Sequence, residues 1–258
     1  MDIEKYTKKI YDKFGQEYQK TREEKRPERA FNEFLEMPCM FKAVGNIKEK
    51  KLLDVGCGAG VHIKKYLKKG ALCSGIDLSE TMISFAREKN KNVHFNVGTI
   101  TKLPYKNNSF GIVTASLMID YVKNLNKAFS EVNRVLKKGG LFYYSDMNPA
   151  TESRDIYENK EIKIDAFGYV EYKKTGKIIS LGRSWLERID HFEMVPGMKV
   201  KFYKRMFRTH LNALIKSGFE LVDFIDCRPV KEFKKYNSKE YEMLTKFPMF
   251  SIYVARKK

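Results

Sequence analysis

The residues best suited to chemistry are a run of glycines and an aspartate that follows it. Gly56, Gly58 and Gly60 lie in residues 54–60, Asp-Val-Gly-Cys-Gly-Ala-Gly, directly after a short apolar run. Glycines let the main chain turn tightly and let a ligand approach it closely. Alone, such a loop is equally compatible with an ordinary turn between a strand and a helix. The surrounding sequence is needed to tell a ligand-binding loop from such a turn.

The spacing around this loop excludes two phosphate-binding patterns. A dinucleotide fingerprint, G-x-G-x-x-G, would need glycine where Val61 stands, and the P-loop pattern G-x-x-x-x-G-K-[ST] is absent from the sequence. Asp77 closes the next apolar run, residues 71–76. A carboxylate there can accept two hydrogen bonds from a ribose diol, a role compatible with helix capping. The loop and Asp77 together favour a ribose-containing ligand.

Alternating apolar patterns predict the elements that position these residues. We expect strands at 51–55, 71–76, 92–97, 111–115 and 141–145, with helices at 61–69, 80–89 and 125–137. Ser79 is a suitable cap for the second of these helices, and Gly139-Gly140 is a suitable stop for the third. Strands that alternate with helices predict an α/β protein with a parallel, doubly wound sheet.

The segments before and after these predicted strands and helices have a different sequence pattern. Residues 1–46 have apolar positions at helical spacing. Residues 147–205 break the alternation, and their pattern suggests short strands or a hairpin that caps the core. A helix at 209–216 and strands at 219–226 and 250–255 are expected to complete the sheet.

Composition narrows the class of protein. The longest stretch without a charged residue, 107–119, is too short and polar to span a bilayer, and the acidic start lacks a signal-peptide pattern. We therefore expect a cytoplasmic protein without a membrane span. The four cysteines and four histidines show no metal-ligand spacing, so we predict neither a metal site nor disulfides.

The net charge of +18 raises the question of a nucleic-acid partner. Residues 1–50, 51–150 and 151–258 carry net charges of +2, +8 and +8, so no segment is a basic tail. Lysine outnumbers arginine by 38 to 12, although arginine suits phosphate and base edges better. Charge alone favours a solvated surface and leaves RNA as an alternative.

Several motifs in order resemble those of class I S-adenosylmethionine-dependent methyltransferases. Residues 52–60 resemble the first motif of that family and residues 75–79, with Met82, the second. Residues 97–104 resemble the segment that flanks adenine, 109–117 the fourth strand with its exit, and 136–141 the turn into the fifth. The resemblance covers about residues 45–147 and, more loosely, 211–219. Thr99 stands where many relatives have an acid, so the resemblance does not by itself imply the usual adenine contact through this side chain.

The resemblance implies a Rossmann-like, doubly wound sheet of seven strands, mostly parallel with an antiparallel last strand. It also implies one methyltransferase domain over residues 1–258. In that domain, 1–46 form a helical lid, 47–147 the cofactor-binding core, 148–205 a cap on the acceptor side after the fifth strand, and 206–258 the end of the sheet.

The resemblance further implies S-adenosylmethionine as cofactor and S-adenosylhomocysteine as product. Glycine backbone would approach the methionine end, Asp77 would hold the ribose, and the tyrosines of the lid would close over the ligand. The residues carried over to the cofactor are Tyr11, Tyr18, Asp54, Gly56, Gly58, Asp77, Leu78, Met82, Thr99, Ile100, Ser116 and Leu117.

The acceptor is less constrained, because methyl transfer from a sulfonium needs mainly proximity and exclusion of water. Residues 116–121 lack the Asn/Asp-Pro-Pro-Tyr segment of base-amino methyltransferases, and they contain no cysteine for attack on cytosine. Together with the cap at 147–205 and the late helix at 209–218, these residues resemble small-molecule methyltransferases of the ubiquinone/menaquinone-biosynthesis type. Asp120 is a candidate to deprotonate or orient an acceptor hydroxyl, and His191 a weaker one. A structural role is the competing interpretation for both.

Three functions therefore stay open at the level of sequence. The first is methylation of a small molecule, and the second is methylation of tRNA or rRNA on the same core. The third is S-adenosylmethionine binding without catalysis. The sequence does not indicate an oligomeric state.

Overall fold

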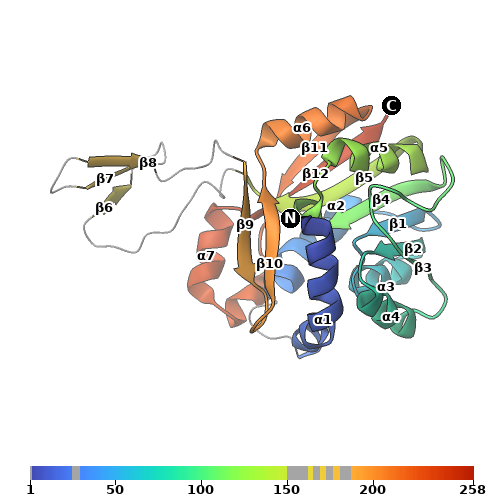
Figure 1. Ribbon diagram of the computed structural model, residues 1–258, viewed down its shortest axis with the longest axis horizontal. Coiled ribbons are helices and arrows are strands. Elements are labelled where there is room, and N and C mark those ends of the chain that lie inside the picture. Colours follow the sequence, from blue (N-terminus) through green and yellow to red (C-terminus); the bar gives the residue numbers. More distant parts are fainter. Residues whose placement is uncertain (1, 25–29, 150–161, 165–168, 173–176, 181–186) are drawn as a thin grey trace.

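The computed structural model describes residues 2–24, 30–149, 162–164, 169–172, 177–180 and 187–258, and every structural statement below refers to these residues. Its centre is a sheet of seven strands in the order β11-β12-β5-β4-β1-β2-β3 (Figure 1). The strands are β1 (Lys51–Val55), β2 (Leu72–Asp77), β3 (His94–Val97), β4 (Phe110–Ser116), β5 (Leu136–Met147), β11 (Phe219–Asp226) and β12 (Phe250–Lys257).

The direction of the strands confirms the predicted architecture. β1 pairs in parallel with β2 and β4, and the pairs β2–β3 and β4–β5 are also parallel. β12, the last strand of the chain, runs antiparallel to β5 and β11. The protein therefore has a Rossmann-like, doubly wound sheet that is mostly parallel. This topology brings the carboxyl ends of β1, β2 and β4 to one edge.

Helices pack on both faces of the sheet because successive strand residues point to opposite sides. Leu53 and Val113 pack toward α5 and α6, whereas Leu52 and Ile112 pack toward α2, α3 and α7. The helices are α2 (Met37–Val44), α3 (Val61–Lys68), α4 (Glu80–Lys89), α5 (Leu125–Val135), α6 (Phe207–Lys216) and α7 (Ser238–Lys246). None of the helices in the described ranges is long and apolar enough to cross a membrane.

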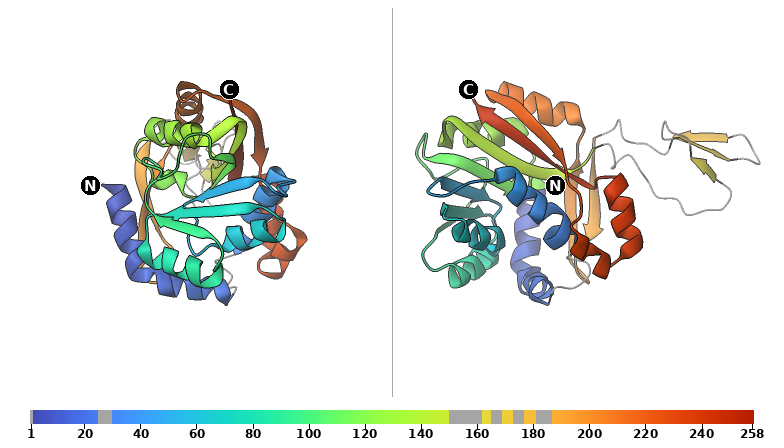
Figure 2. Two further views of the ribbon diagram at one scale, coloured as in Figure 1. Left: turned by 90° about the vertical axis from the view of Figure 1, so that its right-hand side faces the viewer. Right: turned by 180° about the vertical axis from the view of Figure 1, so that it is seen from behind.

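A helix and a hairpin stand over the carboxyl edge of the sheet. α1 (Ile3–Glu23) contacts α4 and also β10 (Lys199–Lys204), which pairs antiparallel with β9 (Arg188–Glu193). Figures 1 and 2 show α1 next to this hairpin. Between α1 and α2, Asn32–Glu36 form a π-helical turn, η2. These segments close the space above the strand ends.

The structure corrects some element boundaries. α5 ends at Val135, and Gly139-Gly140 lie inside β5 rather than after a helix that reaches residue 137. Leu136 already has extended backbone angles and pairs with Phe110, so sheet pairing ends the helix before the glycines are reached. The short helix η5 (Lys231–Lys235) and α7 were not predicted.

Short strands between β5 and β9 agree with the expectation for residues 147–205. β6 (Ile162–Ile164), β7 (Tyr169–Tyr172) and β8 (Lys177–Ser180) form a three-stranded antiparallel sheet. The remaining residues of the predicted cap between 150 and 186 lie outside the described residues.

Candidate functional site

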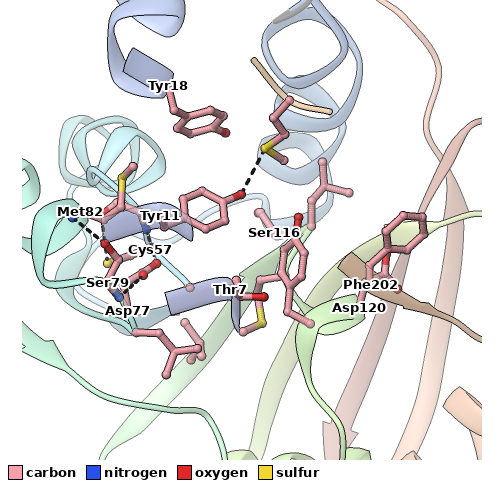
Figure 3. A pocket seen from close by; sticks show the side chains of 18 of the residues that line it. Thr7, Tyr11, Tyr18, Cys57, Asp77, Ser79, Met82, Ser116, Asp120 and Phe202 are labelled. Atoms are coloured by element: carbon pink, nitrogen blue, oxygen red, sulfur yellow. Dashed lines mark hydrogen bonds between the residues drawn. The ribbon is translucent and has the colours of Figure 1, made fainter. Parts of the chain in front are cut away.

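A cavity of about 590 Å³ lies at the carboxyl edge of the sheet, under α1 and the β9–β10 hairpin. Its walls include all twelve residues that the sequence analysis assigns to the cofactor. These are Tyr11, Tyr18, Asp54, Gly56, Gly58, Asp77, Leu78, Met82, Thr99, Ile100, Ser116 and Leu117. Figure 3 shows side chains from α1, the glycine loop and the end of β4 turned toward one space.

The glycine loop and Asp77 are joined directly. The Asp77 carboxylate accepts hydrogen bonds from the backbone N–H of Gly58 (2.9 Å) and of Ser79 (2.9 Å). Ser79 caps α4, as predicted, because its hydroxyl accepts from the N–H of Met82. Burial raises the pKa of Asp77, and the backbone hydrogen bonds oppose that shift. Each carboxylate oxygen keeps a lone pair for a ligand hydroxyl.

A second acidic group lies at the other end of the loop. Asp54, 2% exposed at the end of β1, accepts a hydrogen bond from Thr114 Oγ1 (2.7 Å). Burial raises its pKa to about 6, while His62 and Thr114 favour the charged form. This end of the cavity can therefore change its charge close to neutral pH.

Behind this end lies Glu36, the last residue of η2, with no exposed surface. Its carboxylate accepts a hydrogen bond from Ser145 Oγ (2.6 Å) and lies 3.3 Å from His62 Nε2. Burial raises the pKa of Glu36, but hydrogen bonding and attraction from His62 outweigh it, and the net pKa is lowered. A buried negative charge therefore stands behind Ser116 and His62.

The cavity wall beside Thr99 contains a further acid. Glu4 of α1 accepts a hydrogen bond from Thr99 Oγ1 (3.1 Å), and both residues line the cavity. Leu78, Met82 and Ile100 supply apolar walls in the same region. α1 therefore places the Glu4 carboxylate next to Thr99.

The cavity face of α1 is rich in polar and aromatic groups. Tyr11 and Tyr18 pack edge to face at 5.6 Å between ring centroids, and Tyr11 donates a hydrogen bond to Met194 Sδ. Nearby, Gln19 Oε1 and Arg22 Nε are buried without a hydrogen-bond partner within the described part of the chain. Unpartnered buried polar atoms that line a cavity are groups that a ligand can satisfy.

Residues 53–144 match the model of a family described as a methyltransferase domain. The fold superposes on an S-adenosylmethionine-dependent methyltransferase from Mesorhizobium loti with a TM-score of 0.67 and 25% identity, over 85% of this chain and 96% of that one. The chain carries a class I methyltransferase domain. S-adenosylmethionine is the cofactor of this domain.

Two curated relatives of the methyltransferase differ in how much of the chain they match. An uncharacterized protein of Haemophilus influenzae is 28% identical over 82% of this chain and 83% of its own length. A demethylmenaquinone methyltransferase of Chlorobaculum parvum is 37% identical, but over only 40% of this chain and 43% of its own length. The second match therefore covers less than half of either protein.

The two catalytic candidates of the methyltransferase lie in different environments. Asp120, in the short helix η3 (Ile119–Tyr121), lines the cavity. His191 is exposed on β9 and is not among the lining residues, although its neighbour Phe192 is. The structure thus places Asp120, but not His191, in the wall of the cavity.

Sequence reasoning missed several polar groups around the cavity, chiefly Glu4, Gln19, Arg22, Glu36 and His62. Most of them come from the helical segment before β1, where no motif marks individual positions. The available signal was the helical spacing itself: Glu4, Tyr11 and Tyr18 are seven residues apart in succession and so share one helix face.

Proposed function

We propose that this protein transfers the methyl group of S-adenosylmethionine to a small-molecule acceptor. The observation that carries the proposal is the Asp77 carboxylate, held by the N–H groups of Gly58 and Ser79 inside the cavity. This arrangement suits a ribose diol at the carboxyl end of β2, where open α/β sheets bind ligands.

The nucleoside would lie between the loop and the lid. Asp77 would accept hydrogen bonds from the ribose hydroxyls, and Leu78, Met82 and Ile100 would enclose the adenine. Glu4, beside Thr99, is positioned to accept a hydrogen bond from the adenine amino group. An acid supplied by the lid would thus take the role that many relatives give to the residue at position 99.

The methionine part would lie along the glycine loop toward the end of β4. Its ammonium group would meet the carbonyls at Ser116 and Leu117 and the negative charges of Asp54 and Glu36. Its carboxylate would accept hydrogen bonds from Arg22, whose Nε is buried and unpartnered within the described residues. The negative charges near the ammonium group and the positive charge of Arg22 near the carboxylate would fix the orientation of the methionine part.

A small acceptor fits the remaining space better than a macromolecule does. The named function of one relative, a demethylmenaquinone methyltransferase, supports this class of acceptor. α1 and the β9–β10 hairpin stand over the cavity, so they can exclude water and hold an acceptor in line with the sulfonium. Proximity and orientation supply much of the acceleration that methyl transfer requires.

Calorimetry with S-adenosylmethionine tests the cofactor site. Replacement of Asp77 by Ala removes the ribose contacts and should weaken binding by roughly 1.5–3 kcal/mol, about 10- to 100-fold in Kd. Asp223→Ala, at an exposed aspartate on β11, is the control and should bind normally. Equal affinity of the Asp77→Ala protein would refute the assignment, as would a wild-type protein that does not bind.

Turnover separates an enzyme from a protein that only binds the cofactor. We expect S-adenosylhomocysteine to accumulate when the protein is supplied with S-adenosylmethionine and a panel of small hydroxylated or amine acceptors. Tight binding of the cofactor with no turnover across the panel would favour a binding protein instead.

A further inference from the structure

The half of the cavity away from Asp77 has a distinct lining. Met118, Met194 and Phe202 belong to one apolar cluster at this end, beneath the β9–β10 hairpin. Figure 3 draws Asp120 and Phe202 on the opposite side of the cavity from Asp77. An acceptor bound here would be largely apolar, with one polar group directed at Asp120.

Asp120 is backed by a second carboxyl group. The turn that carries Asp120 packs against β5, and the Asp120 side chain lies close to that of Asp146, at the end of β5, which is 1% exposed. Asp146 also accepts a hydrogen bond from the N–H of Met147 (2.9 Å), and its Oδ2 lies 3.6 Å from His210 Nε2. A hydrogen bond within β5 therefore fixes Asp146, and His210 of α6 lies beside it.

The backbone that carries Asp120 is also fixed. Arg205, 8% exposed, donates hydrogen bonds to the carbonyl oxygens of Ile119 (3.3 Å) and Val122. These carbonyls lie on either side of Asp120. Arg205 therefore clamps the η3 turn and places a positive charge near both carboxyl groups.

When two carboxyl groups lie close together in a buried site, one of them holds a proton because both cannot readily ionise. Burial and the nearby Asp146 raise the pKa of Asp120 well above its usual range, against the attraction of Arg205 and Lys204. Burial, with Arg205, lowers the pKa of His210 to about 3, so this imidazole is neutral. With one proton shared, the two aspartates would carry one negative charge, which Arg205 offsets.

Resting on the function proposed above, we propose that this half of the cavity binds an apolar molecule bearing a phenol-type hydroxyl, and that Asp120 and Asp146 together accept its proton. The acceptor oxygen bonds to the methyl carbon as the carbon–sulfur bond breaks, and that electron pair goes to sulfur. The hydroxyl proton passes to Asp120, whose own proton moves to Asp146. Asp120 is the catalytic residue, and Asp146 is a positioning residue that also takes up the proton.

The charges favour a hydroxyl over an ammonium group. Arg205 already balances the single charge on the aspartate pair, and Lys204 forms an ion pair with Asp190, so the site offers no excess negative charge to a cation. Burying a neutral hydroxyl in an apolar pocket costs little free energy when the pocket supplies a hydrogen-bond acceptor for it. A carboxyl pair with a raised pKa is also a better match for the proton of a phenol.

The test uses tritiated S-adenosylmethionine and a panel of phenols, including catechol and 4-nitrophenol, with the rate followed against pH. Asp120→Asn should lower kcat by about 100-fold or more on the best phenol. Its Kd for S-adenosylmethionine should stay within about twofold. Asp146→Asn should move the acidic limb of the pH profile to lower pH, because Asp120 loses the neighbour that raises its pKa. Asp223→Asn is the matched control and should leave both readouts unchanged.

The outcomes separate this inference from the proposed function. If S-adenosylmethionine does not bind to the wild-type protein, both fail. If it binds but no phenol is methylated, or if Asp120→Asn keeps the wild-type rate, only the present inference is overturned. An unshifted pH profile in a folded Asp146→Asn protein refutes the shared proton. If that variant does not fold, the rate of Asp120→Asn decides alone.

Discussion

Gly56 is constrained both by its backbone and by its neighbour. Its φ is +65°, and a Cβ atom placed there would lie 2.6 Å from Met118 Cγ. Gly56→Ala should therefore lower the free energy of unfolding by about 2–5 kcal/mol, combining left-handed backbone strain with overpacking. Gly139 has a similar φ of +74° with no atom within 4 Å, so Gly139→Ala should cost only about 1–2 kcal/mol. Equal losses in urea unfolding would show that Met118 does not constrain the loop.

Asp54 should make cofactor binding depend on pH. Its pKa is raised to about 6 in the folded protein, against about 3.9 in an unfolded chain. The cofactor-free protein thus binds a proton more tightly than the unfolded chain, so its stability should fall as pH rises from about 4 to 6. The positive charges of S-adenosylmethionine favour ionised Asp54, so affinity should drop by up to about tenfold per pH unit below pH 6.

Calorimetry in two buffers of different ionisation enthalpy would detect the proton released from Asp54 on binding. The raised pKa of Asp77 acts in the same direction, so Asp54→Asn should lose only the part centred near pH 6. An unchanged pH dependence in Asp54→Asn would contradict this assignment.

At the scale of single residues, the sequence was informative where function requires a fixed order along the chain. The glycine loop, Asp77 and Ser79 were predicted from their order along the chain. The structure shows that Asp77 accepts hydrogen bonds from Gly58 and Ser79, and that Ser79 caps α4. Glu36 and Asp146 are different, because each meets its partners across the fold: Glu36 meets Ser145, 109 positions away, and Asp146 meets His210. Only the tertiary arrangement reveals such contacts.

At the scale of elements, α1 is fastened to the core by Asp12. The Asp12 carboxylate accepts hydrogen bonds from Ser79 Oγ (2.7 Å) and from the N–H of Thr81 (3.4 Å), at the start of α4. An anion at a helix N-terminus is favourable. Asp12→Asn should therefore loosen the lid and speed cofactor dissociation about fivefold, equivalent to roughly 1 kcal/mol.

A chase experiment with labelled S-adenosylmethionine measures this rate. Burial raises the pKa of Asp12, but hydrogen bonds from Lys8, Ser79 and Thr81 outweigh this effect and lower it, so the fastening is complete above about pH 4 and is lost at lower pH. Lys9→Ala, on the exposed side of α1, is the control. A wild-type dissociation rate in Asp12→Asn would exclude a role of this contact in lid closure.

Prediction of elements succeeded where local signals and packing agree. Glu80–Lys89 has a capping serine and an apolar face, and its bounds match the prediction. The end of α5 was misplaced because the glycines suggested a stop, whereas pairing of Leu136 with β4 ends the helix earlier. α7 has one fully buried hydrophobic residue, Leu244, so its apolar signal was weak.

At the scale of the whole molecule, the charge of +18 does not gather at the cavity. The basic lining residues Lys8, Arg22 and Lys204 pair with Asp12, Glu33 and Asp190, respectively. The acidic lining residues are Glu4, Asp54, Asp77, Asp120 and Glu193. Among the described residues that line the cavity, a phosphate backbone would therefore meet no cluster of free cations, which favours a small acceptor over RNA.

Bulk tRNA provides the corresponding test of the RNA alternative. Scattered surface lysines should bind it non-specifically, and the affinity should fall by about 10³-fold or more between 50 and 200 mM salt if six or more phosphates are contacted. Because the cavity lining carries no excess of positive charge, that binding should not lead to catalysis. We expect no labelled methyl group in the RNA beyond the level given by Asp77→Ala. Incorporation that depends on Asp77 would instead make RNA the acceptor and would assign the lysine-rich surface to substrate binding.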